Sequence, residues 1–370
     1  MSRRLLILFA AMVVAIAGDL SPRAHAERNA TDPSHGEALW SADTAGAHRI
    51  GLADSRPLLV LPEPGGARAV ALDPARTTAW VWAGSSLLSL GFDGTRGLTL
   101  SLGLPATVHA HLAVRPEDGS VWLAAGRELR GLSAAGAILA SHRLPEPAVD
   151  LALDPAADLL WVATAQSIAA HDPVGGAPLR ALDLGKNPDV RGLAVPPAGG
   201  LWIALRDEAR RLGPDGTLQA STAAQNLTAL AAAPDGGAWL ADAKALWRVG
   251  PSGNVLVRIE PFGGQGAISA LAAHPADGSV WVAAGSSLAK IDAAGRLALR
   301  VDLPAEAQVR DLALFADAVP PTIEIQAPRD GALLAERSPE IELAWQDAGT
   351  GVDPSTLELR LDGASLPVLC

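Results

Sequence analysis

The chain has 370 residues, and 49% of them are hydrophobic, so it is long enough to bury a large apolar core. Its 40 acidic residues outnumber the 29 Lys and Arg residues, which gives a formal net charge of −11. Because nucleic-acid binding needs clustered cationic side chains, this balance and the scattered basic residues argue against a nucleic-acid partner.

The N-terminal segment has the pattern of a signal peptide. Arg3 and Arg4 precede the apolar run LLILFAAMVVAIAG, and Ala24 and Ala26 form a small-x-small cleavage site. We therefore predict a signal peptide over residues 1–26 and a bacterial protein that is secreted, periplasmic or at the cell surface. The apolar run is shorter than a typical membrane span, so no transmembrane segment is expected after cleavage; an uncleaved anchor is the alternative.

The following region repeats, and each unit is marked by a Trp and a turn glycine. The Trp residues are spaced 37 to 42 residues apart, at Trp40, Trp80, Trp122, Trp161, Trp202, Trp239 and Trp281. Fourteen residues after six of them stands a glycine, at Gly94, Gly136, Gly175, Gly216, Gly253 and Gly295, while Asp54 takes this place in the first unit. Identical placement in every unit favours packing, rather than a ligand platform, as the role of these Trp side chains.

Each unit also contains a short apolar strand with an alanine in a fixed place. The alanines follow a Val or Leu, at Ala71, Ala113, Ala152, Ala194, Ala231, Ala272 and Ala313. An alanine strand, the Trp strand, a short third strand and an outer strand after the glycine turn make four antiparallel strands. Four strands in about 40 residues is the size of a propeller blade, with the small alanine on the innermost strand.

The two ends of the repeating region predict a closed ring. The first unit begins at its Trp strand near Leu39 and lacks an alanine strand, whereas a seventh alanine strand, Val309–Phe315, follows the last full unit. Together these pieces complete one blade. We therefore predict an all-β, seven-bladed propeller over residues 27–316, closed by its N- and C-terminal strands. An open β-solenoid is the alternative, and it would need capping repeats.

Two stretches carry a resemblance to known propellers. The stretch DPVGGAPLRALDLGKNPDVRGLAVPP resembles the repeats of YVTN-type propellers, and PADGSVWVAAGSSLAKIDAAG is similar to blades of NHL, streptogramin lyase-like and SMP-30-like propellers. The resemblance covers about residues 38–315. These families include lactonases, lyases, sensors and scaffolds, so the resemblance implies an architecture rather than a reaction.

The C-terminal segment, residues 317–370, follows a different rhythm. After a proline-rich linker, PTIEIQAPRDGALL, EIELAWQDAGTGVD and STLELRLDG alternate like strands and resemble the opening of a bacterial immunoglobulin-like module. Such a sandwich needs about seven strands, so we expect a partial immunoglobulin-like β-sandwich and a chain that is a fragment of a longer protein. The single cysteine, Cys370, excludes an intramolecular disulfide.

Candidate binding residues lie at the start of the alanine strands. The two positions before the repeated apolar-alanine pair vary between units and hold Arg68, His111, Asp150, Arg191, Thr228, Ser269, Arg310 and Asp311. Varied polar groups on a repeated scaffold predict a binding face near the channel mouth. A solvated rim with a few ion pairs is the alternative.

A divalent metal site is a further hypothesis. His109 and His111 are two residues apart on a strand and share one face, and Asp150 of the next unit would be the third ligand. The resemblance to SMP-30-like enzymes implies a metal-binding set of Glu and Asn or Asp residues on the inner strands. The resemblance to streptogramin lyase-like enzymes implies a site that uses His and Glu. No Glu occupies any of the seven alanine strands, so these sets do not carry over.

The sequence thus predicts an exported, non-enzymatic propeller that serves as a recognition or scaffold domain of a larger bacterial surface or secreted protein. The expected partner is a protein, peptide or glycan, the propeller is monomeric within its chain, and no cofactor is required. The alternative is a hydrolase or lyase with a divalent metal in the central channel. A spacer without any ligand is the third possibility.

Overall fold

The computed structural model describes residues 37–51, 57–63, 65–106, 108–264, 266–316, 322–327, 342–346, 359–361 and 364–366. The segment predicted as a signal peptide lies outside these residues. Within them, Glu37–Ala316 form one compact unit, and the strands after Asp317 belong to another. Each unit is therefore described by itself.

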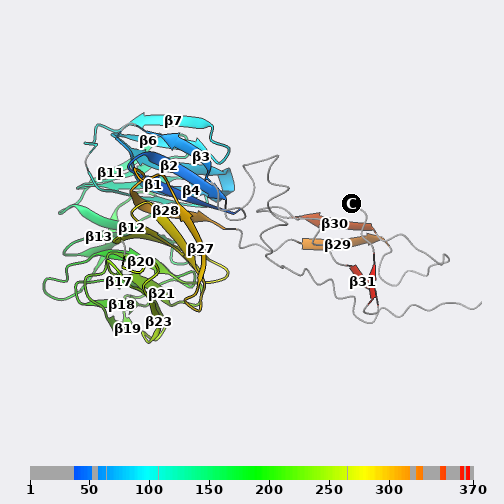
Figure 1. Cartoon of the computed structure of the whole chain (residues 1–370). Helices are drawn as coiled ribbons and strands as arrows, with labels where there is room; N and C mark the ends of the chain where they lie inside the picture. The colour runs from blue at the N-terminus through cyan, green and yellow to red at the C-terminus, as the bar shows by residue number, and fades with distance from the viewer. Residues whose placement is uncertain are drawn as a thin grey trace, which may run out of the picture. The chain divides into compact units, whose positions relative to one another are not determined.

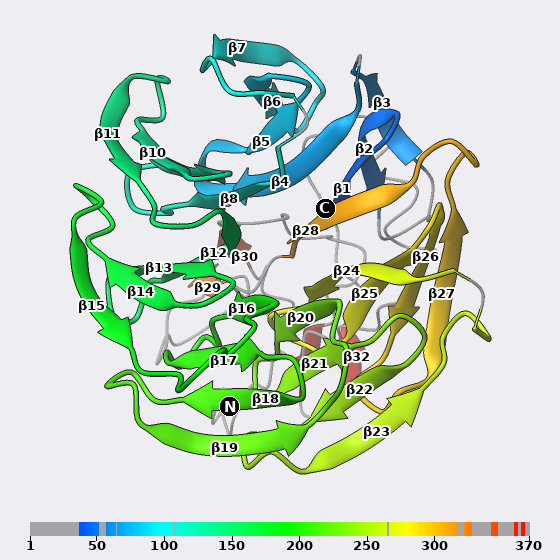
Figure 2. The same cartoon turned by 90° about the vertical axis from the view of Figure 1, so that its left-hand side faces the viewer.

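The described residues of Glu37–Ala316 form seven four-stranded antiparallel sheets, numbered here as blades 1 to 7 (Figures 1 and 2). Blade 1 contains β28 (Val309–Phe315), β1 (Ala38–Asp43), β2 (Gly46–Gly51) and β3 (Pro57–Pro62), and blade 2 contains β4 (Ala67–Asp73), η1 (Pro74–Arg76, a 3-10 helix), β5 (Thr78–Ala83), β6 (Ser86–Gly91) and β7 (Arg96–Ser101). Blade 3 contains β8 (Ala110–Val114), β9 (Val121–Ala125), β10 (Glu128–Leu132) and β11 (Ile138–Arg143), and blade 4 contains β12 (Ala148–Asp154), β13 (Leu159–Thr164), β14 (Ile168–His171) and β15 (Pro178–Leu182). Blade 5 contains β16 (Gly192–Ala194), β17 (Leu201–Ala204), β18 (Glu208–Leu212) and β19 (Leu218–Ala223), blade 6 contains β20 (Ala229–Ala232), β21 (Ala238–Ala241), β22 (Leu246–Val249) and β23 (Val255–Ile259), and blade 7 contains β24 (Ile268–Ala273), β25 (Val280–Ala284), β26 (Ser287–Ile291) and β27 (Leu297–Asp302).

Strands from both ends of the unit close the ring. β28 pairs antiparallel with β1, with Ala313 opposite Trp40 and Phe315 opposite Ala38. The innermost strands β28, β4, β8, β12, β16, β20 and β24 lie around the centre in Figure 2, and each contacts the next, including β24 with β28. The predicted seven-bladed propeller, closed by N- and C-terminal strands, is confirmed, and the open solenoid is wrong.

The repeated alanine and Trp face each other across the two inner strands of each blade. In all seven blades the alanine is the direct cross-strand partner of the Trp, as Ala194 is of Trp202. Cross-strand partners project from the same face of a sheet, so the small methyl group leaves room for the indole. Each of these seven Trp residues is at most 2% exposed. Their burial supports the predicted packing role.

Hydrophobic packing between blades forms the core. One cluster combines Trp161 and Ile168 of blade 4 with Leu193 and Ile203 of blade 5, and other clusters combine other neighbouring blades. The core therefore consists of layers between adjacent sheets, as expected where both faces of every blade are covered. Each blade depends on its two neighbours for burial.

Indole N–H groups add hydrogen bonds between blades. Trp202 Nε1 donates to the carbonyl of Gly236 at 3.0 Å, and Trp239 Nε1 donates to the carbonyl of Gly278 at 3.0 Å. Both carbonyls lie in the turn that follows the innermost strand of the next blade. The Trp thus supplies apolar area and a directional contact to the same neighbour.

The turn glycines follow the predicted spacing with one difference. In five blades the predicted glycine has a left-handed backbone, with φ between 82° and 90°, at Gly94, Gly136, Gly216, Gly253 and Gly295. In blade 4 the residue with positive φ is Gly176, at 71°, rather than the predicted Gly175. Asp54, the predicted counterpart in the first unit, lies outside the described residues.

The described residues of the second unit form two separate pairs of strands. β29 (Thr322–Ala327) pairs antiparallel with β30 (Glu342–Gln346), and β31 (Leu359–Leu361) pairs antiparallel with β32 (Ala364–Leu366). The described residues here form two two-stranded sheets, and the predicted immunoglobulin-like sandwich is not assembled among them. Across the described parts of both units, no helix has the length and apolar character needed to cross a membrane.

Candidate binding site

A polar cavity of about 560 Å³ lies where the innermost strands of the propeller begin. Residues from all seven blades line this channel-mouth cavity. They include every predicted binding residue and the additional histidine of the metal hypothesis: Arg68, His109, His111, Asp150, Arg191, Thr228, Ser269, Arg310 and Asp311. Side chains from positions up to 243 residues apart in the sequence are thus brought to one place.

Irregular pairing between the innermost and second strands directs several of these side chains into the cavity. The register slips by one residue near the start of β4, β24 and β28, so Arg68, Ser269 and Arg310 have no directly opposed partner on the second strand. The same slip occurs at Val149 in β12. An extra residue of this kind bends the strand and changes the direction of its side chain. All four of these residues line the cavity.

Asp150 and Asp311 occupy the same position in blades 4 and 1, and both connect their blade to the next. Asp311 Oδ2 accepts a hydrogen bond from the Val70 amide at 2.9 Å, and Asp150 Oδ2 accepts one from the Leu193 amide at 2.9 Å. The other carboxylate oxygen of each accepts from the amide of the following residue, at 2.9 and 2.8 Å respectively. These two carboxylates therefore fix the spacing of neighbouring innermost strands.

The proposed metal ligands are only partly brought together. His111 Nδ1 lies 3.5 Å from Asp150 Oδ1, and His109 lines the same cavity. Among the residues that the structure describes, no three His, Cys, Asp or Glu side chains are grouped so that they could hold a metal ion. The predicted pair of His111 and Asp150 exists, but the three-ligand set with His109 is not formed.

The buried charges at the mouth shift one another's pKa values. Burial raises the pKa of Asp311 from 3.8 to about 6, and the charge of Asp150 also raises it, while the Val70 hydrogen bond and the charge of His111 oppose the shift. Burial works against the protonated form of His111, but its hydrogen bond to Asp150 and the two carboxylate charges outweigh burial and raise its pKa. The pKa of His111 therefore lies above the usual value of a histidine, and that of Asp311 lies above the usual range of a carboxyl group.

Replacing His111 with Gln is expected to raise the pKa of Asp311 above its native value of about 6. A protonated His111 stabilises the Asp311 carboxylate, and the neutral amide of Gln cannot do so, which fixes the sign of the change. The carboxyl-carbon chemical shift of Asp311, followed by NMR during a pH titration, measures it. Asp215, in the turn between β18 and β19 at the opposite end of the strands, should titrate as before; an unmoved Asp311 would contradict the coupling.

Neutral hydroxyl groups occupy the corresponding positions in blades 6 and 7. Thr228 Oγ1 and Ser269 Oγ lie 3.4 Å from the carbonyl oxygens of Ala241 and Ala283. Hydrogen bonds this long are weak, so both hydroxyls can reorient toward a ligand at little cost. The rim of the cavity is therefore uneven, with charged groups in blades 1 to 5 and hydroxyls in blades 6 and 7.

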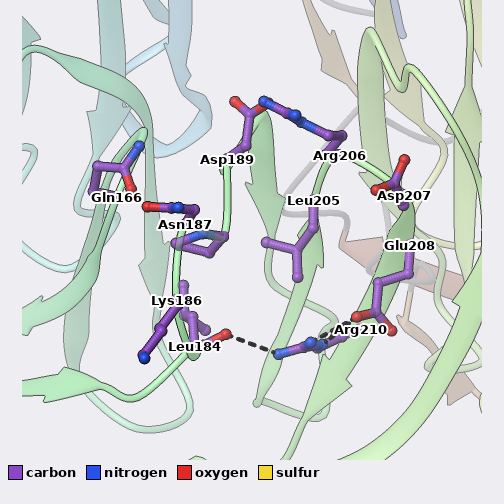
Figure 3. Close-up of a pocket in the computed structure, with 11 residues that line it drawn as sticks. Gln166, Leu184, Lys186, Asn187, Asp189, Leu205, Arg206, Asp207, Glu208 and Arg210 are labelled. Carbon is purple, nitrogen blue, oxygen red and sulfur yellow. Dashed lines mark hydrogen bonds and ion pairs between the residues drawn. The ribbon is translucent and has the colours of Figure 1, made fainter.

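A second cavity of about 500 Å³, which the sequence did not predict, lies between blades 4 and 5 (Figure 3). It is lined by Gln166, Leu184, Lys186, Asn187, Pro188, Asp189, Leu205, Arg206, Asp207, Glu208 and Arg210. Asn187 and Asp189, in the connection between the blades, have left-handed backbones with φ of 49° and 47°. The only signal for it in the sequence was that the connection Lys186–Asp189 differs from those between other blades.

Asp189 links the two cavities. Its Oδ2 accepts from Arg206 Nε at 2.8 Å, in the second cavity, and from Arg191 Nη2 at 2.7 Å, in the channel mouth. These hydrogen bonds, that of Arg206 first, lower the pKa of Asp189. The charge of Arg191 is thus paired with a carboxylate that it shares with Arg206.

The fold and the cavity together define the class of protein: a closed seven-bladed β-propeller with a polar cavity at one end of its channel. No protein-family model and no curated protein matches the chain. A catalytically inactive virginiamycin B lyase from Staphylococcus aureus, solved with quinupristin, matches with a TM-score of 0.56 and 14% identity over 67% of this chain and 92% of that chain. Apo AztD from Citrobacter koseri matches with a TM-score of 0.55 and 12% identity over 76% of this chain and 98% of that one. Hydrazine synthase from Kuenenia stuttgartiensis matches with a TM-score of 0.56 and 12% identity over 71% of this chain and 98% of that chain. At these identities the likeness shows the fold alone.

Proposed function

We propose that the chain is an exported propeller of the NHL/YVTN type that acts as a non-enzymatic recognition or scaffold domain of a larger bacterial surface or secreted protein. Its ligand, a protein, peptide or glycan, binds at the channel-mouth cavity. The carrying observation is that the polar residues which vary between repeats line this one cavity of about 560 Å³. The signal-peptide pattern and the immunoglobulin-like resemblance of the C-terminal segment support the exported, multi-domain setting.

The contrast between repeated and varied residues supports binding at this place. The repeated Trp and alanine side chains are packed between blades and account for the architecture. The varied residues instead include a carboxyl whose pKa burial raises to about 6, an arrangement that disfavours its charged form. Perturbed charges in a cavity are typical of functional sites, and a plain spacer has no need of them.

Binding is expected to depend on the cavity, and Arg191→Ala tests this dependence. The Arg191 guanidinium lines the cavity, so its removal should weaken binding of a ligand found on glycan or peptide arrays by about tenfold or more. Calorimetry with the full chain gives the affinity. Arg296→Ala is the matched control, because Arg296 is exposed in the turn between β26 and β27 at the far end of the strands. Equal affinity in both variants would mean that the ligand binds outside the cavity, and the absence of any ligand would favour the spacer.

The second candidate function is a metal-dependent hydrolase or lyase, favoured by the pair of His111 and Asp150 inside the cavity. Metal analysis of the purified protein separates the two candidates. One tightly held divalent ion per chain that is lost in His111→Ala would support the enzyme and overturn the non-enzymatic proposal. A chain that retains no metal after incubation with zinc or calcium would remove the enzyme.

A further inference from the structure

Two arginines of neighbouring blades share one side of the channel mouth. Arg310 of blade 1 and Arg68 of blade 2 are the extra residues of their irregular strands, and both line the cavity. Burial lowers the pKa of Arg310, and the charge of Arg68 lowers it further. The two arginines thus come from the neighbouring innermost strands β28 and β4 and line the same cavity, and the charge of Arg68 disfavours the charged form of Arg310.

The acids of the cavity do not neutralise this pair. Asp311 directs its two carboxylate oxygens to the amides of Val70 and Leu312, and its raised pKa of about 6 means that its charge is weakened in mildly acidic solution. Asp150 bonds to backbone amides and lies beside His111 on the side of blades 3 and 4. Asp189, another acid near the mouth, is shared by Arg191 and Arg206 as described above.

Asp43 is the acid whose charge acts on Arg310, but its oxygens are already used. Asp43 Oδ1 accepts from the amides of Ala45 and Gly46 at 2.8 and 3.1 Å, and Oδ2 lies 2.6 Å from His48 Nδ1. Asp43 is fully buried. Among the residues that the structure describes, Asp43 forms no ion pair with Arg68 or Arg310, although its charge favours the charged form of Arg310.

Backbone carbonyls hold both guanidinium groups in place. Arg68 Nε donates to the carbonyl of Ala106 at 2.8 Å, and Arg310 Nη1 donates to the carbonyl of Ala67 at 3.2 Å. A guanidinium has five N–H donors, and the described part of the chain shows no further hydrogen bond from either one. Most donors of this oriented pair are thus available to a ligand.

We propose that Arg68 and Arg310 together bind an oxyanion, a carboxylate or phosphate group of the ligand, at the channel mouth. This inference rests on the proposed recognition function and gives its ligand a chemical class. An oxyanion placed between two guanidinium groups removes their repulsion and accepts charge-assisted hydrogen bonds from both. The hydroxyls of Ser269 in blade 7 and Thr228 in blade 6 line the same cavity and can donate hydrogen bonds to polar groups of the ligand that lie next to its oxyanion.

Calorimetric titration of the full chain with citrate, and separately with inorganic phosphate, tests the anion site in chloride buffer of low ionic strength. At least one of the two anions should bind, and its affinity should fall about tenfold or more in both Arg68→Gln and Arg310→Gln, the loss expected for a charge-assisted hydrogen bond. Arg310→Lys, which keeps the charge but not the planar fork, should fall between native and Arg310→Gln. Arg296→Gln, on the far end of the strands, should bind as the native chain does.

Two outcomes of these titrations would overturn the inference, and a ligand found on the arrays supplies a further test. The first is binding of neither anion at about 10 mM by the native chain. The second is equal affinity in the native chain and in Arg68→Gln and Arg310→Gln variants whose thermal unfolding shows them to be folded. If a ligand from the arrays is lost in Arg191→Ala but retained in these two variants, recognition at the mouth stands and the oxyanion class fails. If Arg191→Ala has no effect either, both fail.

Discussion

A chain that ends after Leu303 is expected to lose the cooperative unfolding of the propeller, whereas a chain that ends after Ala316 is expected to keep it. The shorter chain lacks β28, the innermost strand of blade 1. That strand pairs with β1 along its length and contacts β24 and β4 on either side. Its removal would open the ring at the only seam where strands from distant parts of the sequence share a blade among the described residues.

The expected effect is large because β28 contributes buried side chains to the layers on both sides of blade 1. Val309, Leu312 and Phe315 are at most 8% exposed, and the Phe315 ring lies 5.1 Å from that of Phe92. Burying a large apolar side chain contributes about 1.5–3 kcal/mol, so three of them approach the whole stability of an ordinary domain, about 5–15 kcal/mol. Unpaired β1 would also become an edge prone to aggregation.

Urea unfolding monitored by Trp fluorescence measures this effect. The chain ending after Ala316 is the control, because it keeps all seven blades and lacks only the residues from Asp317 onward. Addition of a synthetic peptide with the sequence of β28 should restore part of the lost cooperativity. If the urea transition of the shorter chain had the same midpoint and the same slope as that of the control chain, closure by β28 would contribute little to stability.

The fold could be predicted because the repeat encodes it in local sequence. A Trp at a fixed distance from an alanine and a turn sets both the register and the face of each strand. The pairing of Trp202 with Ala194 in blade 5 therefore has an equivalent in every other blade. The missing first alanine strand and the extra seventh one predicted the closure. The shift from Gly175 to Gly176 in blade 4 shows the limit, because neighbouring glycines satisfy the same spacing.

The site was predicted in part, and for a specific reason. Residues that vary at fixed repeat positions must meet at one end of the channel once the ring is closed, so Arg68 and Asp311 could be placed without a structure. Their roles could not, because a one-residue slip in strand pairing and hydrogen bonds to the next blade leave no mark in the sequence pattern. The second cavity depends on the left-handed backbones of Asn187 and Asp189, which belong to no repeat.

Replacing Trp202 with Ala is expected to lower the free energy of unfolding by about 3–5 kcal/mol without a specific loss of ligand binding. Trp202 is 0% exposed, lies opposite Ala194 and packs against blade 6. Truncation leaves a cavity that the rigid sheets cannot fill, and it removes the donor to the Gly236 carbonyl. Chemical unfolding of the native chain and the variant under identical conditions measures the difference.

Two further variants separate packing from hydrogen bonding. Leu218→Ala, at a residue 61% exposed on the outer strand of the same blade, should change stability by less than about 0.5 kcal/mol. Trp202→Phe keeps most of the apolar volume but loses the N–H, and it should cost about 1 kcal/mol more than Trp281→Phe, because the described residues give Trp281 Nε1 no partner. If Trp202→Ala were as stable as Leu218→Ala but lost ligand binding, the indole would belong to the binding site instead of to the packing between blades.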